Sequence, residues 1–220
     1  MIGAEMKYGA LSAKVHALYG KRLRTADLTR LAAMKSPAEI LDALRQHPGW
    51  SRALAQAAPG GWNYVGRVEV ENALWEELRL EYLALSHYVP REDQPLMQFQ
   101  VRMAERSALL AALRDLKAGR AGEGVTRASG ILRRSRVDCG ALAGCGSYDQ
   151  LLTAARGTIY HDALLHLRPG PGEPLPDYTI AECLLRTAYF SYMHRIARQQ
   201  YAGSARSTLL RSLGEQVDLL

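Results

Sequence analysis

Apolar residues recur along this chain at the spacing of an α-helix. Three stretches, 8–18, 70–85 and 180–196, carry an apolar side chain at almost every third or fourth position. These positions are Tyr8, Leu11, Val15 and Leu18, then Val70, Leu74, Leu78, Tyr82 and Leu85, then Ile180, Leu184, Ala188, Tyr192 and Ile196. Residues at this spacing share one face of a helix, so each stretch predicts an amphipathic helix. The sequence lacks the alternating, β-branched stretches of strands and is rich in Ala, Leu and Arg, so we predict an all-α fold.

Two helix starts and two helix breaks can be located more closely. Ser36 precedes Pro37 and lies three residues before Glu39, the arrangement of a capped helix start. Ser147 lies three residues before Gln150 and repeats that pattern. The Pro- and Gly-containing segments 58–61 and 169–176 should interrupt helices, because proline lacks an amide donor and glycine is costly to order.

The chain resembles itself when it is shifted by about 110 residues. At that offset Leu74 meets Leu184, Tyr82 meets Tyr192 and Pro59 meets Pro169, and a slip of one residue pairs Ser36 with Ser147. Apolar positions meet apolar positions, and loops meet loops. We therefore predict two similar helical bundles, 1–112 and 113–220, joined by a helix that includes residues 109–116.

Composition and charge are those of an ordinary globular protein. The 220 residues are 48% hydrophobic and 23% charged, with a net charge of +6. No apolar run approaches the length that crosses a bilayer, and the N-terminal residues lack the pattern of a secretory signal. Three cysteines, Cys139, Cys145 and Cys183, without CxxC spacing, favour a reducing compartment over a disulfide or zinc framework.

Several segments resemble one family. Residues 8–18 are similar to its opening motif, and 23–27 with 35–41 are similar to its second and third conserved segments. Residues 78–82, Leu-Arg-Leu-Glu-Tyr, resemble its long helix, and 215–220, Glu-Gln-Val-Asp-Leu-Leu, resemble a Glu-x-Asp-Leu-Leu-Asn motif. The family is that of the C-type stalk proteins of V-type ATPases and ATP synthases, which are named d in eukaryotes. His16 departs from its pattern, since arginine is usual there.

The resemblance implies a mechanical role. It implies a non-catalytic rotor subunit, without cofactor, metal site or catalytic residues, that couples the central stalk to the proteolipid ring for ion transport. The expected location is the cytoplasmic face of the membrane, peripheral and not inserted. Family members have three bundles, so a length of 220 residues implies that the third repeat is absent. An uncovered C-terminal face could then support a homo-oligomer.

A basic segment is the candidate partner-binding surface. Residues 114–136 hold seven basic and two acidic residues, a net charge of +5. We predict that Arg127, Arg133, Arg134 and Arg136 bind lipid headgroups or an acidic protein partner. No aromatic residue lies among them for base stacking, so nucleic acid is not the expected partner. A basic helical adaptor for nucleic acid stays open as an alternative.

One pair suggests catalysis instead. The adjacent His161 and Asp162 resemble the centre of HD-type metal-dependent phosphohydrolases, which are also all-α. Such a site needs further ligands, which His47 or His87 and Asp177 or Asp218 could supply. At the repeat offset the pair meets polar residues, so an exposed polar pair explains it equally well. Among the three tryptophans, Trp75 is predicted to lie in the core.

Overall fold

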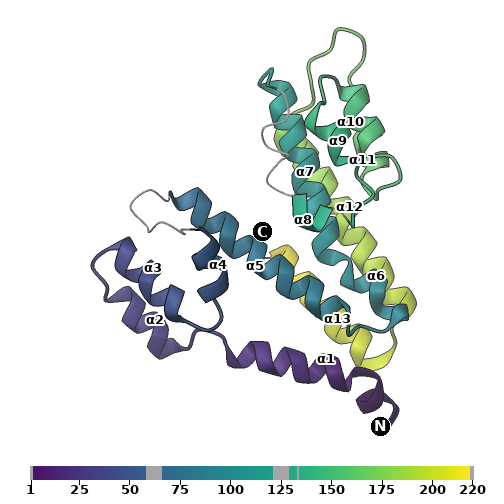
Figure 1. Cartoon of the computed structure of the whole chain (residues 1–220). Coiled ribbons are helices and arrows are strands. Elements are labelled where there is room, and N and C mark those ends of the chain that lie inside the picture. The colour runs from purple at the N-terminus through teal and green to yellow at the C-terminus, as the bar shows by residue number, and fades with distance from the viewer. Residues whose placement is uncertain (1, 58–65, 121–128, 133, 219–220) are drawn as a thin grey trace. The chain divides into compact units, whose positions relative to one another are not determined.

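The computed structural model describes residues 2–57, 66–120, 129–132 and 134–218 (Figure 1). Helices and connecting loops make up these ranges, and no strand occurs within them. The predicted all-α fold is therefore confirmed. The predicted break at 58–61 lies outside the described residues.

Contacts between residues divide the chain into two units, Met1–Glu92 and Asp93–Leu220. The predicted repeat boundary between 112 and 113 lies inside a helix of the second unit. The repeat boundary rests on sequence similarity and the unit boundary on packing, so the two need not coincide. The division into repeats stays a prediction.

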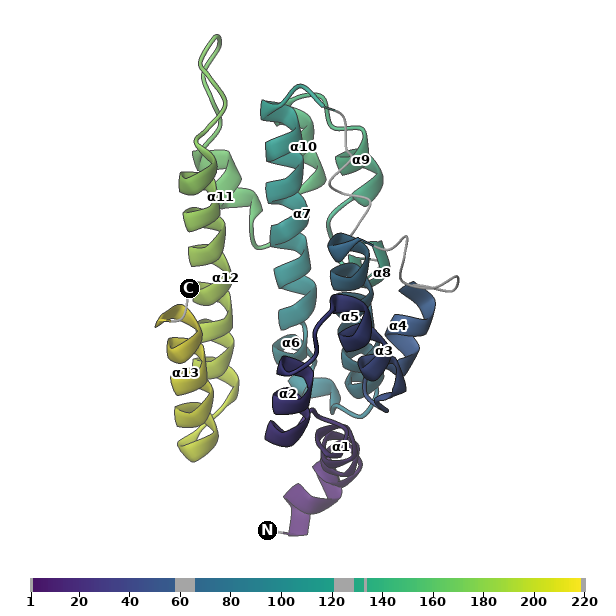
Figure 2. The same ribbon diagram turned by 90° about the vertical axis from the view of Figure 1, so that its left-hand side faces the viewer.

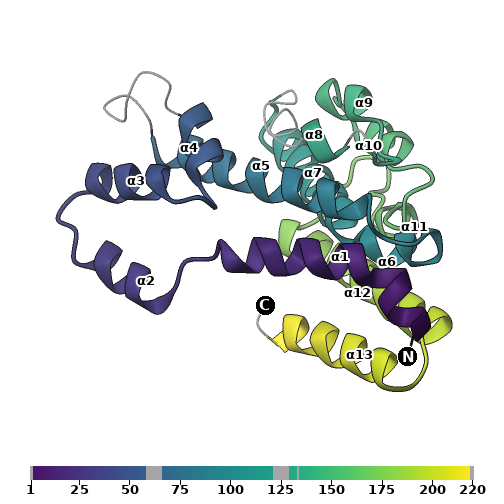
Figure 3. The same ribbon diagram turned by 60° about the horizontal axis from the view of Figure 1, so that its bottom comes forward.

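The first unit is helical throughout its described elements. They are α1 (Ile2–Gly20), α2 (Thr25–Ala32), α3 (Pro37–Gln46), α4 (Ser51–Ala57) and α5 (Arg67–Ser86). Helix α4 packs on both α3 and α5, and α1 contacts α5. Figure 3 shows α2 and α3 as separate helices joined by a bend, with α3 beside α4. Helices α1 and α5 contain the predicted helical stretches 8–18 and 70–85, which are confirmed.

The second unit is built around two long helices. A short 3₁₀ turn, η2 (Arg91–Asp93), precedes α6 (Gln94–Met97) and α7 (Phe99–Lys117). The other described elements are α8 (Ser129–Leu132), α9 (Cys139–Ala143), α10 (Tyr148–Ala154), α11 (His161–His166), α12 (Tyr178–Gln200) and α13 (Gly203–Asp218). Figure 2 shows α7 and α12 side by side, with α13 next to α12. Helix α12 confirms the predicted stretch 180–196, and α7 contains 109–116.

Both predicted caps form, with matching hydrogen bonds. The Ser36 side chain accepts a hydrogen bond from the backbone N–H of Glu39, and the Glu39 carboxylate accepts one from the N–H of Lys35. The Ser147 side chain accepts from the N–H of Gln150 in the same way. The Gln150 side chain in turn accepts from the N–H of Gly146. Each start satisfies two of the amide groups that a helix leaves unpaired.

The second unit has the larger core. Its fully buried side chains come from α7, α12 and the short helices between them, and include Leu109, Leu113, Leu151, Tyr160, Leu164 and Leu185. The Tyr160 hydroxyl donates to the carbonyl oxygen of Arg102 at 2.6 Å, and the Tyr148 hydroxyl donates to that of Leu164 at 2.8 Å. Burial raises the pKa of Tyr148 to about 12. Buried hydroxyls with partners are what a well-packed interior requires.

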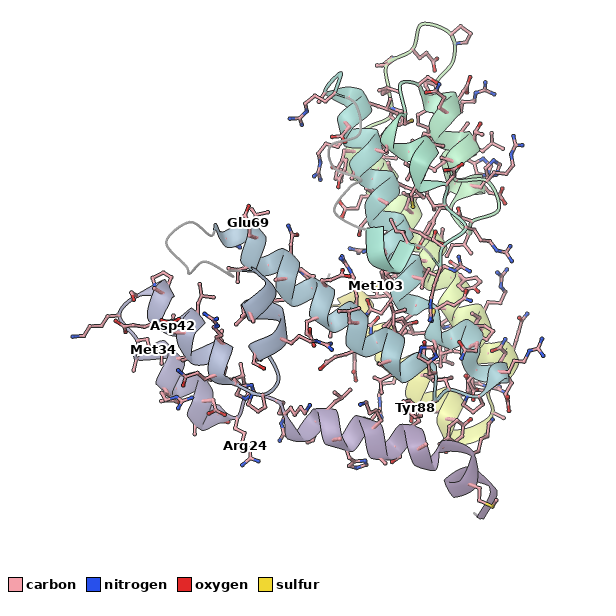
Figure 4. All side chains as sticks on the ribbon, in the orientation of Figure 1. Arg24, Met34, Asp42, Glu69, Tyr88 and Met103 are labelled. Atoms are coloured by element: carbon pink, nitrogen blue, oxygen red, sulfur yellow. The ribbon has the colours of Figure 1, made fainter. Side chains whose placement is uncertain are left out.

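The first unit buries much less. Its buried apolar residues lie mainly on α4 and α5, such as Leu54 and Tyr82, while α2 and α3 have no buried residue. Side chains such as Arg24, just before α2, and Glu69, in the first turn of α5, are labelled in Figure 4. The prediction that Trp75 lies in the core is wrong, since 55% of its surface is exposed. Trp75 precedes Tyr82 by two turns on the same face of α5, and that face is covered at Tyr82 but not at Trp75.

Candidate functional site

A buried ion pair lies beneath the basic segment. The side chain of Glu105 on α7 has no exposed surface, and Arg102 lies one turn before it. The Arg102 Nη1 donates to both carboxylate oxygens of Glu105, at 2.8 and 3.0 Å, and its Nη2 donates to Gln98. Burial opposes the charge of Arg102, but the attraction of Glu105 prevails and raises its pKa. The pair is therefore fixed and charged inside the unit.

Glu105 also holds the loop that follows α8. The Ser135 hydroxyl donates to Glu105 Oε1 at 2.9 Å, and the backbone N–H of Arg136 donates to the same oxygen at 3.3 Å. The Ser135 oxygen then accepts from the backbone N–H of Val137 at 2.8 Å. Val137 itself is buried. One buried carboxylate thus anchors residues 135–137 on α7.

This anchoring leaves two predicted arginines at the surface. Arg134 and Arg136 are exposed on either side of Ser135, whose side chain points inward to Glu105. Arg127 and Arg133, the other two predicted residues, lie outside the described side chains. Binding by these four residues stays a prediction.

Two other cations of the segment contact the start of α12. Arg114 donates to the Tyr178 hydroxyl at 2.7 Å, with its guanidinium 4.7 Å from the centre of that ring. The Lys117 ammonium donates to the carbonyl oxygen of Pro176 at 3.1 Å. These cations tie the break at 169–176, which the structure confirms as non-helical, to the end of α7. The basic segment therefore has an internally bonded part and an exposed part.

The Arg102–Glu105 network is the feature that sequence reasoning missed. A charged pair three residues apart in a stretch as apolar as 101–113 was a possible signal, because unpaired charges are rarely buried. The partner in the loop, Ser135, is thirty positions along the chain from Glu105. Helical periodicity gives no information about contacts at that separation.

The His161–Asp162 pair does not form the centre of a larger group. His161 Nδ1 lies 3.2 Å from Asp162 Oδ1, and the Asp162 side chain is almost fully exposed. The suggested ligand Asp177 instead caps α12, where it accepts hydrogen bonds from Thr179 and Ile180, which lowers its pKa. Within the part of the chain that the structure describes, no three His, Cys, Asp or Glu residues are grouped so as to hold a metal ion.

The fold and these surfaces define an all-α protein with a well-packed second unit and a basic loop anchored on it. The profile of the ATP synthase (C/AC39) subunit family matches residues 11–220, and the chain belongs to this family. Members of the family are stalk subunits of V-type ATPases. Comparisons with curated proteins and with solved structures give no match. In the described ranges, every helix is too short or too polar to cross a membrane.

Proposed function

We propose that the chain couples the central stalk of a V-type ATPase to the membrane proteolipid ring. The observation that carries this proposal is the family match, which extends over residues 11–220. In this role the chain binds the stalk on one side and the ring on the other, on the cytoplasmic face of the membrane. It transmits rotation and performs no chemistry itself.

The packing of the second unit suits a part that transmits force. Helices α7 and α12 pack along each other, and Leu109, Leu113, Leu185 and Tyr189 on them are almost fully buried. Close-packed protein interiors have low compressibility and transmit strain. A displacement applied to one of these helices is therefore passed to the other.

The proposed repeat would give the chain two related bodies. Its support is the recurrence of helix starts: α3 and α10 are capped by Ser36 and Ser147 with the same pairs of hydrogen bonds. Helices α4 and α11 begin at Ser51 and His161, and α5 and α12 begin at Arg67 and Tyr178. All these starts are separated by about 110 residues.

Arg134 and Arg136 supply a contact for an acidic partner. Both are exposed, and Glu105 fixes the backbone between them, so little ordering is needed when a partner binds. Complementary charge across an interface speeds association and helps to select the partner. We assign this contact to an acidic surface of the stalk or ring subunits.

Capture of stalk and ring subunits on the immobilised full chain tests this assignment. The double variant Arg134→Glu/Arg136→Glu should bind its partner about tenfold or more weakly at low salt, with a smaller difference at high salt. The matched control is Lys35→Glu/Arg45→Glu, which reverses two exposed charges in the first unit. The control should bind as the wild type does. Equal binding by wild type and the Arg134/Arg136 variant would contradict the assignment.

A further inference from the structure

A pocket in the first unit has no role in the account so far. It has a volume of about 410 Å³ and lies between α1, the start of α4 and α5. Helix α1 contributes Lys14, Leu18 and Lys21, which share one face because they are four and three residues apart. Helix α5 contributes a stripe from Glu77 to Ala84. Its size is that of sites for small molecules.

One ion pair on the wall of the pocket is already complete. Arg52 donates from Nε to both Glu77 oxygens, at 3.0 and 2.9 Å, and from Nη2 to Oε1 at 2.6 Å. The Glu77 side chain is only 8% exposed. This geometry uses the fork of the guanidinium fully and neutralises the Glu77 charge. Neither residue has a charge left over for a ligand.

The remaining charges of the pocket are unequal. Lys14 and Lys21 line it, and no carboxylate among the described residues forms an ion pair with either. The other carboxyl group is that of the half-buried Glu81. Burial raises the pKa of Glu81, and the charge of Glu77 adds to this, while Lys21, Arg52 and Lys14 oppose it. The pocket therefore holds two ammonium groups against one carboxylate that is partly disfavoured.

We propose that this pocket binds an oxyanion carried on a short apolar body, held by the ammonium groups of Lys14 and Lys21. The oxyanion supplies the charge that the two lysines lack. Leu18, Leu80 and Ala84 line the pocket beside the charged groups and receive the apolar body. A few polar groups that orient a ligand among apolar walls are usual in small-molecule sites.

The backbone holds one side of the pocket in place. A Cβ atom on Gly49 would lie 2.7 Å from the carbonyl oxygen of Lys21, so only glycine allows this approach. The loop before α4 therefore lies directly against the end of α1, next to the Lys21 side chain. The site is formed before a ligand arrives, which lowers the cost of binding.

Butanesulfonate is a suitable probe, because its charge does not change in the working pH range. Binding to the full chain is measured by calorimetry and by NMR shifts of the Lys14 and Lys21 amides. Sulfate tests the oxyanion alone, and butanol tests the apolar body alone. We expect butanesulfonate to bind more tightly than sulfate, and butanol to shift neither amide. No binding of butanesulfonate at concentrations up to tens of millimolar would overturn the proposal.

The variant Lys14→Gln/Lys21→Gln tests the two cations while it keeps most of each side chain. Hydrogen bonds to charged groups contribute enough for a loss of about tenfold in affinity per lysine. Lys35→Gln is the matched control, since Lys35 is exposed in the same unit, and it should bind as the wild type does. Affinity unchanged in the double variant would overturn the proposal.

Acidity should strengthen binding in the wild type. Protonation of Glu81 removes the negative charge nearest to the ligand, so affinity rises as pH falls through its raised pKa. The groups that face Glu81 are Lys14 and Lys21 from α1, Arg52 from α4 and Glu77 from its own helix. Glu81→Gln should bind equally well across that range. A pH dependence that persists in Glu81→Gln would contradict this assignment of the proton.

Discussion

At the residue scale, the most consequential side chain is Glu105. It is fully buried, pairs with Arg102 inside its own helix and accepts two further hydrogen bonds from residues 135 and 136. A buried charge without its partner is strongly destabilising, whereas a complete pair is tolerated. Glu105 is therefore needed both for the core of the second unit and for the place of the exposed arginines.

Replacing Glu105 with alanine should lower the free energy of unfolding by about 3–5 kcal/mol, because it leaves the Arg102 charge buried and unpaired. Chemical denaturation of the full chain, followed by circular dichroism, measures this. The control is Arg168→Ala, which removes the exposed pair between Arg168 and Asp149 in the same unit. Exposed pairs contribute about 1 kcal/mol or less. A loss in Glu105→Ala no larger than in the control would show that the network is not structural.

At the element scale, the caps and helix faces show what periodicity can establish. Ser36 and Ser147 indicate helix starts because a cap depends only on residues three or four positions away. The exposure of Trp75 could not be predicted in this way. Periodicity identifies a face of α5, but the length over which that face is covered depends on which helices pack on it.

Alanine at either cap should cost about 1 kcal/mol of stability, the usual contribution of a serine N-cap. Thermal unfolding of Ser36→Ala and Ser147→Ala, each compared with wild type, measures the two effects. Ser204→Ala serves as the control, because Ser204 is exposed in α13 and has no capping bond among the described contacts. If both cap variants unfold at the temperature of this control, the capping hydrogen bonds contribute nothing.

At the scale of the whole molecule, sequence reasoning reached the fold class and the family, and the structure adds the division into two units. The helical pattern is local, so it can be read from one sequence. The boundary between Glu92 and Asp93 and the anchoring of Arg136 depend on packing between distant residues. For the same reason, the charge of segment 114–136 could be counted from the sequence, but not which cations stay at the surface. Arg114 and Lys117 contact the start of α12, while Arg136 is exposed.

The most direct test of the coupling role is reconstitution of a V-type ATPase from its other subunits in proteoliposomes, with and without this chain. ATP hydrolysis and ATP-driven ion uptake are measured in the same preparation. Without the chain, we predict hydrolysis with little ion uptake, because the stalk turns without driving the ring. Addition of the chain should restore uptake. Equal uptake with and without the chain would contradict the proposed function.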